Sequence, residues 1–267
     1  MTEPDKQKIA QALIEFGKKF GKLDLKKEKY FTPNLEADRL LWNCPLAFLF
    51  GVILDQSMKA EKVWEIPYLL KQRLGHLDVK KIASIPEKEI IAIFNQKPKL
   101  HRFPKTMALR IKKACQLLLE KYEGKAENIW NDNPKSDELQ RRFEEFDGIG
   151  QKKASMATNI LVRDFGIKIK DKRGIDISYD IHLRRVFLRT GLVEKDDMNL
   201  MIKTAREINP EYPGVLDNPC WIIGREYCHP KNPECDKCPI SKVCPKLLNA
   251  PIPVSYTHLT LPTTERV

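Results

Sequence analysis

Apolar residues recur at helical spacing along most of the chain. Ile9, Leu13, Phe16 and Phe20 repeat every three or four positions among lysines, which predicts an amphipathic helix over 5–21. Similar patterns predict helices at 44–54, 77–84, 86–94, 104–122, 136–145, 151–165, 179–190, 196–208 and 214–227. No alternation of apolar and polar residues extends far enough for a sheet, so we predict an all-α fold.

Several positions suggest where these helices begin and bend. Cys44–Leu54 is apolar on every side and too short to span a bilayer, which predicts a buried helix. Ser57 is a candidate cap for the next helix, and Pro67 is expected to kink or restart that helix. Ser136 is a candidate cap for the helix that begins near it.

A helix-hairpin-helix pattern occupies Phe146–Ala154, with the sequence FDGIGQKKA. Gly148 and Gly150 permit a hairpin tight enough for its backbone to approach another molecule closely. The helix that follows exposes free N–H groups at its start, where a phosphate can bind beside Lys152 and Lys153. This suggests DNA held by its backbone, although a turn between two core helices has the same glycines.

The chain contains seven cysteines, four of which fall within seventeen residues near the C-terminal end. Cys228, Cys235, Cys238 and Cys244 have one close pair and two wide gaps, whereas structural zinc usually takes two close pairs. Four thiolates in an irregular, proline-rich loop favour a [4Fe–4S] cluster over zinc. Because the other three are scattered through helical patterns, we expect no disulfide framework.

The charge balance indicates a polyanionic partner. The chain has 47 Lys and Arg against 36 Asp and Glu, a formal charge of +11. The stretch from Lys152 to Arg189 contains ten Lys and Arg residues but only four Asp residues. This local excess of positive charge favours a DNA-facing surface near the hairpin. This stretch includes the basic segment 166–178, whose function the sequence leaves open. The N-terminal residues show no secretion signal, so we expect a soluble intracellular protein.

The tail at 254–267 is excluded from this interpretation. Its residues VSYTHLTLPT are similar to the in-frame translation of a sequencing-library adapter. His258 is therefore no candidate ligand.

The hairpin, the YDIH sequence at Tyr179–His182 and the cysteine loop occur in a characteristic order. Together they resemble the endonuclease III branch of the helix-hairpin-helix (HhH-GPD) DNA glycosylases, over roughly residues 38–246. The family's LPGVGRKTA corresponds to FDGIGQKKA, and its VDTH corresponds to YDIH. GREYC, which ends on the first loop cysteine, also has a similar counterpart.

The resemblance implies two interleaved helical domains with a DNA cleft between them. A six-helix barrel would span 38–165, and a cluster domain would span 166–250. The N-terminal helix, within 1–37, would pack with the cluster domain. The resemblance also implies a monomeric, cytoplasmic protein of prokaryotic type associated with the nucleoid.

The resemblance also assigns roles to individual residues. Lys152 would be the nucleophile that attacks the sugar, and Asp180 would be the catalytic carboxylate. Gln56 would fill the gap left by the extruded nucleotide. The remaining expected DNA contacts are Gly148, Gly150, Lys153 and His182. Cys228, Cys235, Cys238 and Cys244 would hold a [4Fe–4S] cluster.

Some positions depart from the family pattern. Asp147 replaces a proline and brings a negative charge close to the phosphate site, and Gln151 replaces a basic residue. The segment 166–178 is longer than in typical members, which indicates a divergent subfamily. Gly51–Ile53 has no acid where the adenine-mismatch branch has its glutamate, which argues against that branch.

The expected function is therefore removal of a damaged base from duplex DNA, with abasic-site lyase activity through a Schiff base. Two alternatives stay open. A monofunctional glycosylase would use Asp180 and water, leaving Lys152 as a phosphate contact. A non-catalytic DNA-binding or damage-sensing protein would use neither residue chemically.

Overall fold

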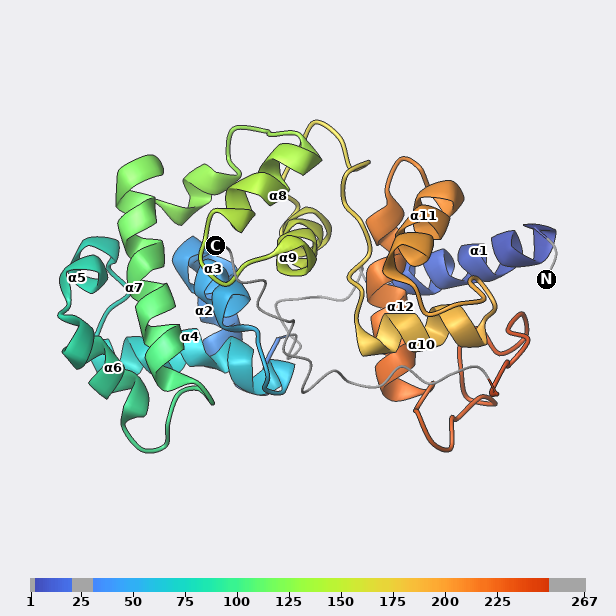
Figure 1. Ribbon diagram of the computed structural model, residues 1–267, viewed down its shortest axis with the longest axis horizontal. Coiled ribbons are helices and arrows are strands. Elements are labelled where there is room, and N and C mark those ends of the chain that lie inside the picture. The colour runs from blue at the N-terminus through green and yellow to red at the C-terminus, as the bar shows by residue number, and fades with distance from the viewer. Residues whose placement is uncertain (1–2, 21–30, 250–267) are drawn as a thin grey trace, which may run out of the picture.

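The computed structural model describes residues 3–20 and 31–249, so the expectation for the tail at 254–267 lies outside the described residues (Figure 1). In these ranges the secondary structure is entirely helical, which confirms the predicted all-α class. The helices are α1 Glu3–Phe20, α2 Leu35–Asn43, α3 Pro45–Leu54, α4 Ala60–Leu74, α5 Val79–Ser84, α6 Glu87–Asn95, α7 Pro104–Lys121, α8 Ser136–Glu144, α9 Gln151–Arg163, α10 Ile181–Arg189, α11 Met198–Ile208 and α12 Asp217–Glu226, with 3₁₀ turns η1 Ala126–Ile129 and η2 Pro213–Leu216.

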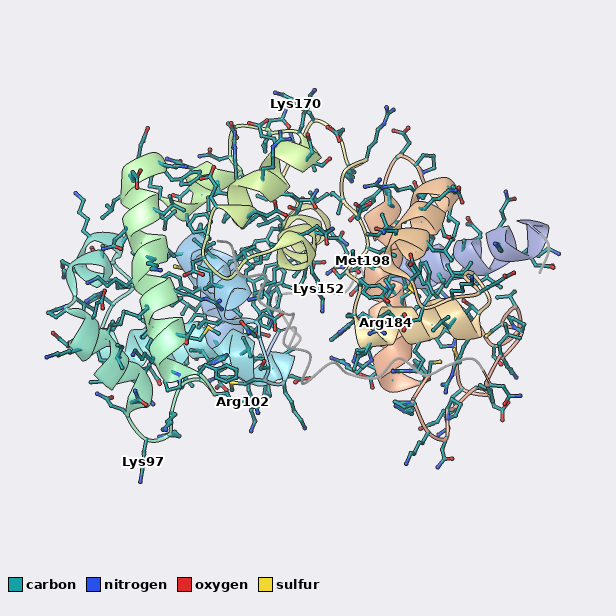
Figure 2. The ribbon with its side chains drawn as sticks, viewed as in Figure 1. Lys97, Arg102, Lys152, Lys170, Arg184 and Met198 are labelled. Atoms are coloured by element: carbon teal, nitrogen blue, oxygen red, sulfur yellow. The ribbon has the colours of Figure 1, made fainter. Side chains whose placement is uncertain are left out.

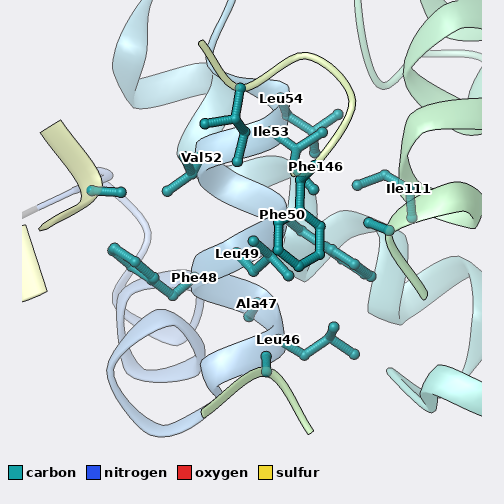
Figure 3. Packing of buried hydrophobic residues seen from close by; sticks show 14 of the residues in the cluster. Leu46, Ala47, Phe48, Leu49, Phe50, Val52, Ile53, Leu54, Ile111 and Phe146 are labelled. Carbon is teal, nitrogen blue, oxygen red and sulfur yellow. The ribbon is translucent and has the colours of Figure 1, made fainter. Parts of the chain in front are cut away.

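The first hydrophobic core is built around α3. Nine of its residues, from Leu46 to Leu54, are buried, which confirms the buried helix predicted from its apolar sequence. Helices α2 and α4 to α9 surround it, and Figure 3 shows Phe50 of α3 packed close to Phe146. No single helix in the described ranges is long and apolar enough to cross a membrane, and only α2 with α3, bent by 112°, reaches that length together.

The second hydrophobic core joins the two ends of the chain. Ile9 and Leu13 of α1 are buried together with residues of α10, α11 and α12. Figure 1 shows α1 beside α12, far from the helix α2 that follows it in sequence. The described chain thus forms two lobes, one around each core. Phe31 belongs with the first lobe, since its ring stacks on Trp64 at 4.9 Å. The domain limits given above stay a prediction.

The segment 166–178 connects the two lobes. Ser136 of α8 donates to Asp171 at 2.6 Å and accepts from the backbone N–H of Gly174 at 2.9 Å. On the other side, Asp176 forms a salt bridge with Arg206 of α11 at 2.7 Å. The prediction that Ser136 caps α8 is therefore wrong, because its hydroxyl is engaged with this segment and Lys135 occupies the cap position.

The prediction for the start of α4 is also wrong. The helix begins at Ala60, and Ser57 lies before it in the left-handed conformation with φ 56°, because residues 55–58 form a separate loop. Pro67 lies inside α4, so the helix does not restart there, whereas a kink at Pro67 stays a prediction. Its ring is buried in the first lobe, so tertiary packing retains a residue that disfavours a helix interior.

The close contact between α3 and α4 gives a stability prediction. A Cβ on Gly51 would lie 2.5 Å from the Trp64 ring, which Phe31 and Phe48 hold in place. Gly51→Ala should therefore lower the free energy of unfolding by about 1–3 kcal/mol, measured by urea denaturation.

Gly150→Ala is the matched control, because a Cβ there meets nothing within 4 Å and the backbone φ is −107°. Its free energy of unfolding should stay within about 0.5 kcal/mol of wild type. Equal stability of the two variants would contradict the packing described for α3 and α4.

Candidate functional site

The hairpin before α9 depends on its two glycines in different ways. Gly148 has φ 89°, a conformation that favours glycine, and a Cβ there would lie 2.7 Å from the guanidinium of Arg110, which would have to move. Gly150 has extended backbone and caps α9 without a side chain. The first N–H groups of α9 are thus left without a side-chain cap, as an anion-binding helix start requires.

Asp147 is compensated by cations from α7. Its carboxylate lies 3.4 Å from Nε of Arg110 and 3.3 Å from Nζ of Lys113. The negative charge that the sequence placed near the phosphate site therefore has two positive partners. Because Arg110 also packs against Gly148, the acid helps to fix the hairpin on α7.

Lys152 and Lys153 follow each other in α9 but lie in different surroundings. Lys152 is exposed and lines a cleft, whereas Lys153 is partly buried and donates to the backbone oxygen of Ile53 at 2.9 Å. Burial lowers the pKa of Lys153 to about 8, with smaller contributions from Arg110 and Lys152. Asp55 opposes this shift. Lys153 is therefore an internal amine that holds α9 against the end of α3.

Asp180 caps helix α10. Its Oδ1 accepts from the backbone N–H groups of His182 at 2.7 Å and Leu183 at 2.8 Å. Both cap bonds go to the same oxygen. The carboxyl group is thus oriented by the backbone at the start of α10.

A cleft of about 690 Å³ brings together side chains of both lobes. Lys152, Asp180 and His182 line it, and Figure 2 shows Lys152 beside α9, between the lobes. Trp64 and Trp221 contribute aromatic walls from α4 and α12. Two residues that the sequence assigned to chemistry therefore face the same space.

The loop that carries Gln56 is held from two sides. Arg110 donates to Oε1 of Gln56 at 2.9 Å. Buried His101 accepts from the N–H of Phe103 through Nδ1, so its Nε2 donates to the backbone oxygens of Leu54 and Gln56. Gln56 is exposed and does not line the cleft. The other expected DNA contacts that do not line the cleft are Gly148, Gly150 and Lys153.

Besides Asp180, four carboxyl groups line the cleft, and two of them that were missed in the sequence have pKa values raised by burial. Burial raises the pKa of Asp55, against the opposing charges of Lys153 and Lys152. Burial also raises the pKa of Asp217 to about 7, and the charge of Asp180 adds to this effect. No local pattern marks Asp217, whereas Asp55 directly precedes the candidate Gln56 in the sequence.

Arg225 of α12 was also missed. Its guanidinium lies 4.2 Å from the centre of the Trp221 ring, and it forms salt bridges with Glu226 at 2.5 Å and with Glu61 of α4 at 3.7 Å. The Glu61 contact joins one lobe to the other across the cleft.

The four cysteines of the C-terminal loop line one small cavity with apolar walls. Arg189 donates to Sγ of Cys228 at 3.6 Å, and the N–H of Lys246 donates to Sγ of Cys244 at 3.4 Å. In the described ranges no three His, Cys, Asp or Glu side chains converge closely enough to bind one metal ion. Sulfurs placed around a cavity fit a cluster, in which each cysteine binds a different iron.

Comparison with known proteins identifies the family of this chain. The family profile described as HhH-GPD superfamily base excision DNA repair protein matches residues 50–210. Endonuclease III of Buchnera aphidicola subsp. Baizongia pistaciae is 28% identical over 136 residues, 50% of this chain and 54% of the relative. Endonuclease III of Rickettsia felis is 27% identical over 164 residues, which are 61% of this chain and 62% of that relative. The matches thus span about half to three-fifths of these relatives' length.

Solved structures show the same fold. A trapped endonuclease III–DNA covalent intermediate superposes with a TM-score of 0.63 at 22% identity, covering 93% of this chain and 98% of that chain. A thermostable thymine-DNA glycosylase superposes with a TM-score of 0.62 at 15% identity, covering 93% of this chain and 99% of that chain.

The buried amine of Lys153 predicts a pH dependence of stability. Between about pH 8 and pH 10.5 the unfolded chain keeps a proton on this lysine that the folded chain has released. The free energy of unfolding of wild type should therefore rise with pH in this window relative to Lys153→Met, by on the order of 2 kcal/mol in total. Urea denaturation across the window measures the difference, and parallel curves for both proteins would contradict it.

Proposed function

Because the chain belongs to the HhH-GPD superfamily of base excision DNA repair proteins, we propose that it excises a damaged base from duplex DNA and cleaves the abasic site. The observation that supports this most directly is the shared cleft of Lys152 and Asp180, which come from different lobes. An amine and a carboxylate at one extruded nucleotide supply a nucleophile and a base for attack at the sugar.

Duplex DNA is the partner that the charges favour. The formal charge of +11 attracts the phosphate backbone, and the uncapped start of α9 offers N–H groups to one phosphate. Gln56, exposed on a loop held by Arg110 and His101, would enter the gap in the base stack. His182 would contact the extruded nucleotide from the wall of the cleft.

The proposed reaction begins with attack of the neutral Lys152 amine on C1′ of the damaged nucleotide. Asp180 takes the proton from this amine and stabilises positive charge that develops on the sugar. Expulsion of the base leaves the Lys152 nitrogen on C1′. Cleavage of the C1′–O4′ bond, with a proton going to O4′, then opens the sugar ring and gives the Schiff base, from which β-elimination cuts the strand 3′ to the lesion. Both cap bonds of Asp180 use Oδ1, so Oδ2 is available for these tasks.

A monofunctional glycosylase is the second candidate. The exposed position of Lys152 at the helix start also suits a phosphate contact, and Oδ2 of Asp180 would then activate water. This reaction leaves the strand intact, whereas the lyase reaction cuts it.

We also propose that Cys228, Cys235, Cys238 and Cys244 hold a [4Fe–4S] cluster. Their cavity and the N–H groups directed at two of the sulfurs fit bound thiolates. When bound, the cluster would supply structural cross-links within the loop. Arg189 reaches this loop a second time through the backbone oxygen of His229 at 2.6 Å, which ties it to α10.

Borohydride trapping on a duplex with one abasic site tests the function. Wild type should form a covalent protein–DNA adduct, and Lys152→Ala should lose it while still binding the duplex. Lys153→Ala is the neighbouring control and should keep the adduct, because that amine is held by Ile53. Binding without any adduct from wild type would contradict the lyase reaction and favour the monofunctional candidate.

Iron analysis tests the cluster. The purified protein should contain about four iron atoms and absorb visible light, and Cys235→Ser should lose most of both. Cys115→Ser is the control, since Cys115 is buried in the first core, away from the loop. Stoichiometric zinc without iron in wild type would contradict the cluster.

A further inference from the structure

The segment 166–178 presents apolar and charged side chains to opposite sides. Ile167 and Ile169 are partly buried against the first core, whereas Lys168 and Lys170 are exposed. Such alternation is typical of an extended chain with one face on the protein and the other in solvent. Three exposed lysines of this segment form what we call the lysine row: Lys168, Lys170 and Lys172.

The aspartates of the same segment are engaged with the protein. Asp171 accepts from the hydroxyl of Ser136 at 2.6 Å, and the buried Asp176 is paired with Arg206 at 2.7 Å. Among the residues that the structure describes, no carboxylate lies within 4.0 Å of an ammonium group of the lysine row. The segment therefore keeps its negative charges against the protein and presents its lysines to solvent.

Exposed acids around the lysine row already have arginine partners. Glu211 is paired with Arg173 at 2.9 Å, and Asp132 is paired with Arg142 at 2.7 Å. Arg142 lowers the pKa of Asp132 most, and Lys170 adds a smaller effect, so this acid lies near the row. Because both acids are paired with arginines, the positive charge of the row is left largely uncompensated.

The backbone that carries the lysine row is fixed to α8 and the residues before it. The N–H of Lys170 donates to the backbone oxygen of Pro134 at 2.9 Å. Gly174 donates to Ser136 Oγ at 2.9 Å and accepts from the Gln140 amide at 2.6 Å. Since the backbone is already ordered, a partner that binds the row restricts only the lysine side chains.

The chemistry of the row selects among anionic partners. Protein interfaces are poor in lysine and rich in aromatic residues, whereas the isoleucines of this segment pack against the core. Single-stranded nucleic acids stack their bases on aromatic rings, but the Tyr212 ring is covered by the Lys172 ammonium at 5.0 Å. Point charges without stacking groups suit the phosphate backbone of a duplex, which is bound without reading its sequence.

We propose that the lysine row binds the phosphate backbone of duplex DNA as a second contact, outside the cleft. None of the three lysines lines the cleft, and Figure 2 shows Lys170 at the edge of the molecule and Lys152 between the lobes. The row therefore adds affinity for undamaged duplex without touching the extruded nucleotide. This goes beyond the proposed reaction and rests on duplex DNA as the partner.

Binding of an undamaged duplex by the full chain, followed by fluorescence anisotropy between about 50 and 200 mM salt, tests the proposal. The row variant is Lys168→Gln/Lys170→Gln/Lys172→Gln. Each phosphate contact adds about 0.9 to the steepness with which log K falls against log salt. The row variant should therefore reduce this steepness by about 2–3 relative to wild type.

The matched control is Lys71→Gln/Lys80→Gln/Lys88→Gln, which removes the same charge from exposed positions on α4 to α6. It should keep the wild-type salt dependence, because charges far from the phosphates are screened by salt. Both variants retain Lys152, so both should form the borohydride-trapped adduct on abasic DNA at saturating protein concentration. The adduct also shows that both variants are folded.

Two results would overturn the second contact: a wild-type salt dependence in the row variant, or an equal decrease in the control variant. Loss of polyglutamate binding in the row variant, with duplex binding unchanged, would also overturn it and assign the row to an acidic protein. The expected change in salt dependence without any adduct from wild type would instead contradict the proposed lyase reaction and leave the second contact standing.

Discussion

The placement of α9 between two lobes determines the rest of the site. Its apolar face, with Ala154, Ala157 and Leu161, is buried in the first core. On its other side Ser155 donates to the backbone oxygen of Asp176 at 2.6 Å, and Asn159 donates to that of Gly214 at 2.8 Å. Both donors are almost fully buried, so breaking either bond would leave an unpaired polar group inside the protein. These bonds fix Lys152 relative to the segment that ends at Asp180.

The distribution of charge separates two tasks. The chain as a whole is strongly basic, which suits attraction of the phosphate backbone at long range. Asp55, Asp180 and Asp217 nevertheless line the cleft. In the proposed reaction Asp180 would act on the sugar, where positive charge develops, while the net positive charge of the chain would offset the repulsion between these acids and the phosphates.

The sequence predicts those features that local pattern controls. The all-α class follows from helical periodicity, and the burial of α3 follows from its uniformly apolar sequence. The burial of Lys153, the pairing of Asp147 with Arg110 and the position of Asp217 depend on segments that are remote in the chain. Periodicity carries no information on such contacts. Ser136 is an example of this limit on sequence-based prediction. Serine is a favoured cap residue, but the Ser136 hydroxyl donates to Asp171 of the segment 166–178 instead of capping α8.

The proposed lyase reaction requires that one amine of α9, that of Lys152, reaches the sugar. Peptide mapping by mass spectrometry of the wild-type adduct, obtained after borohydride reduction on abasic DNA, tests this requirement. We expect the sugar remnant on Lys152. A remnant on Lys153, or on a lysine outside the cleft, would contradict the assignment of the two amines described here.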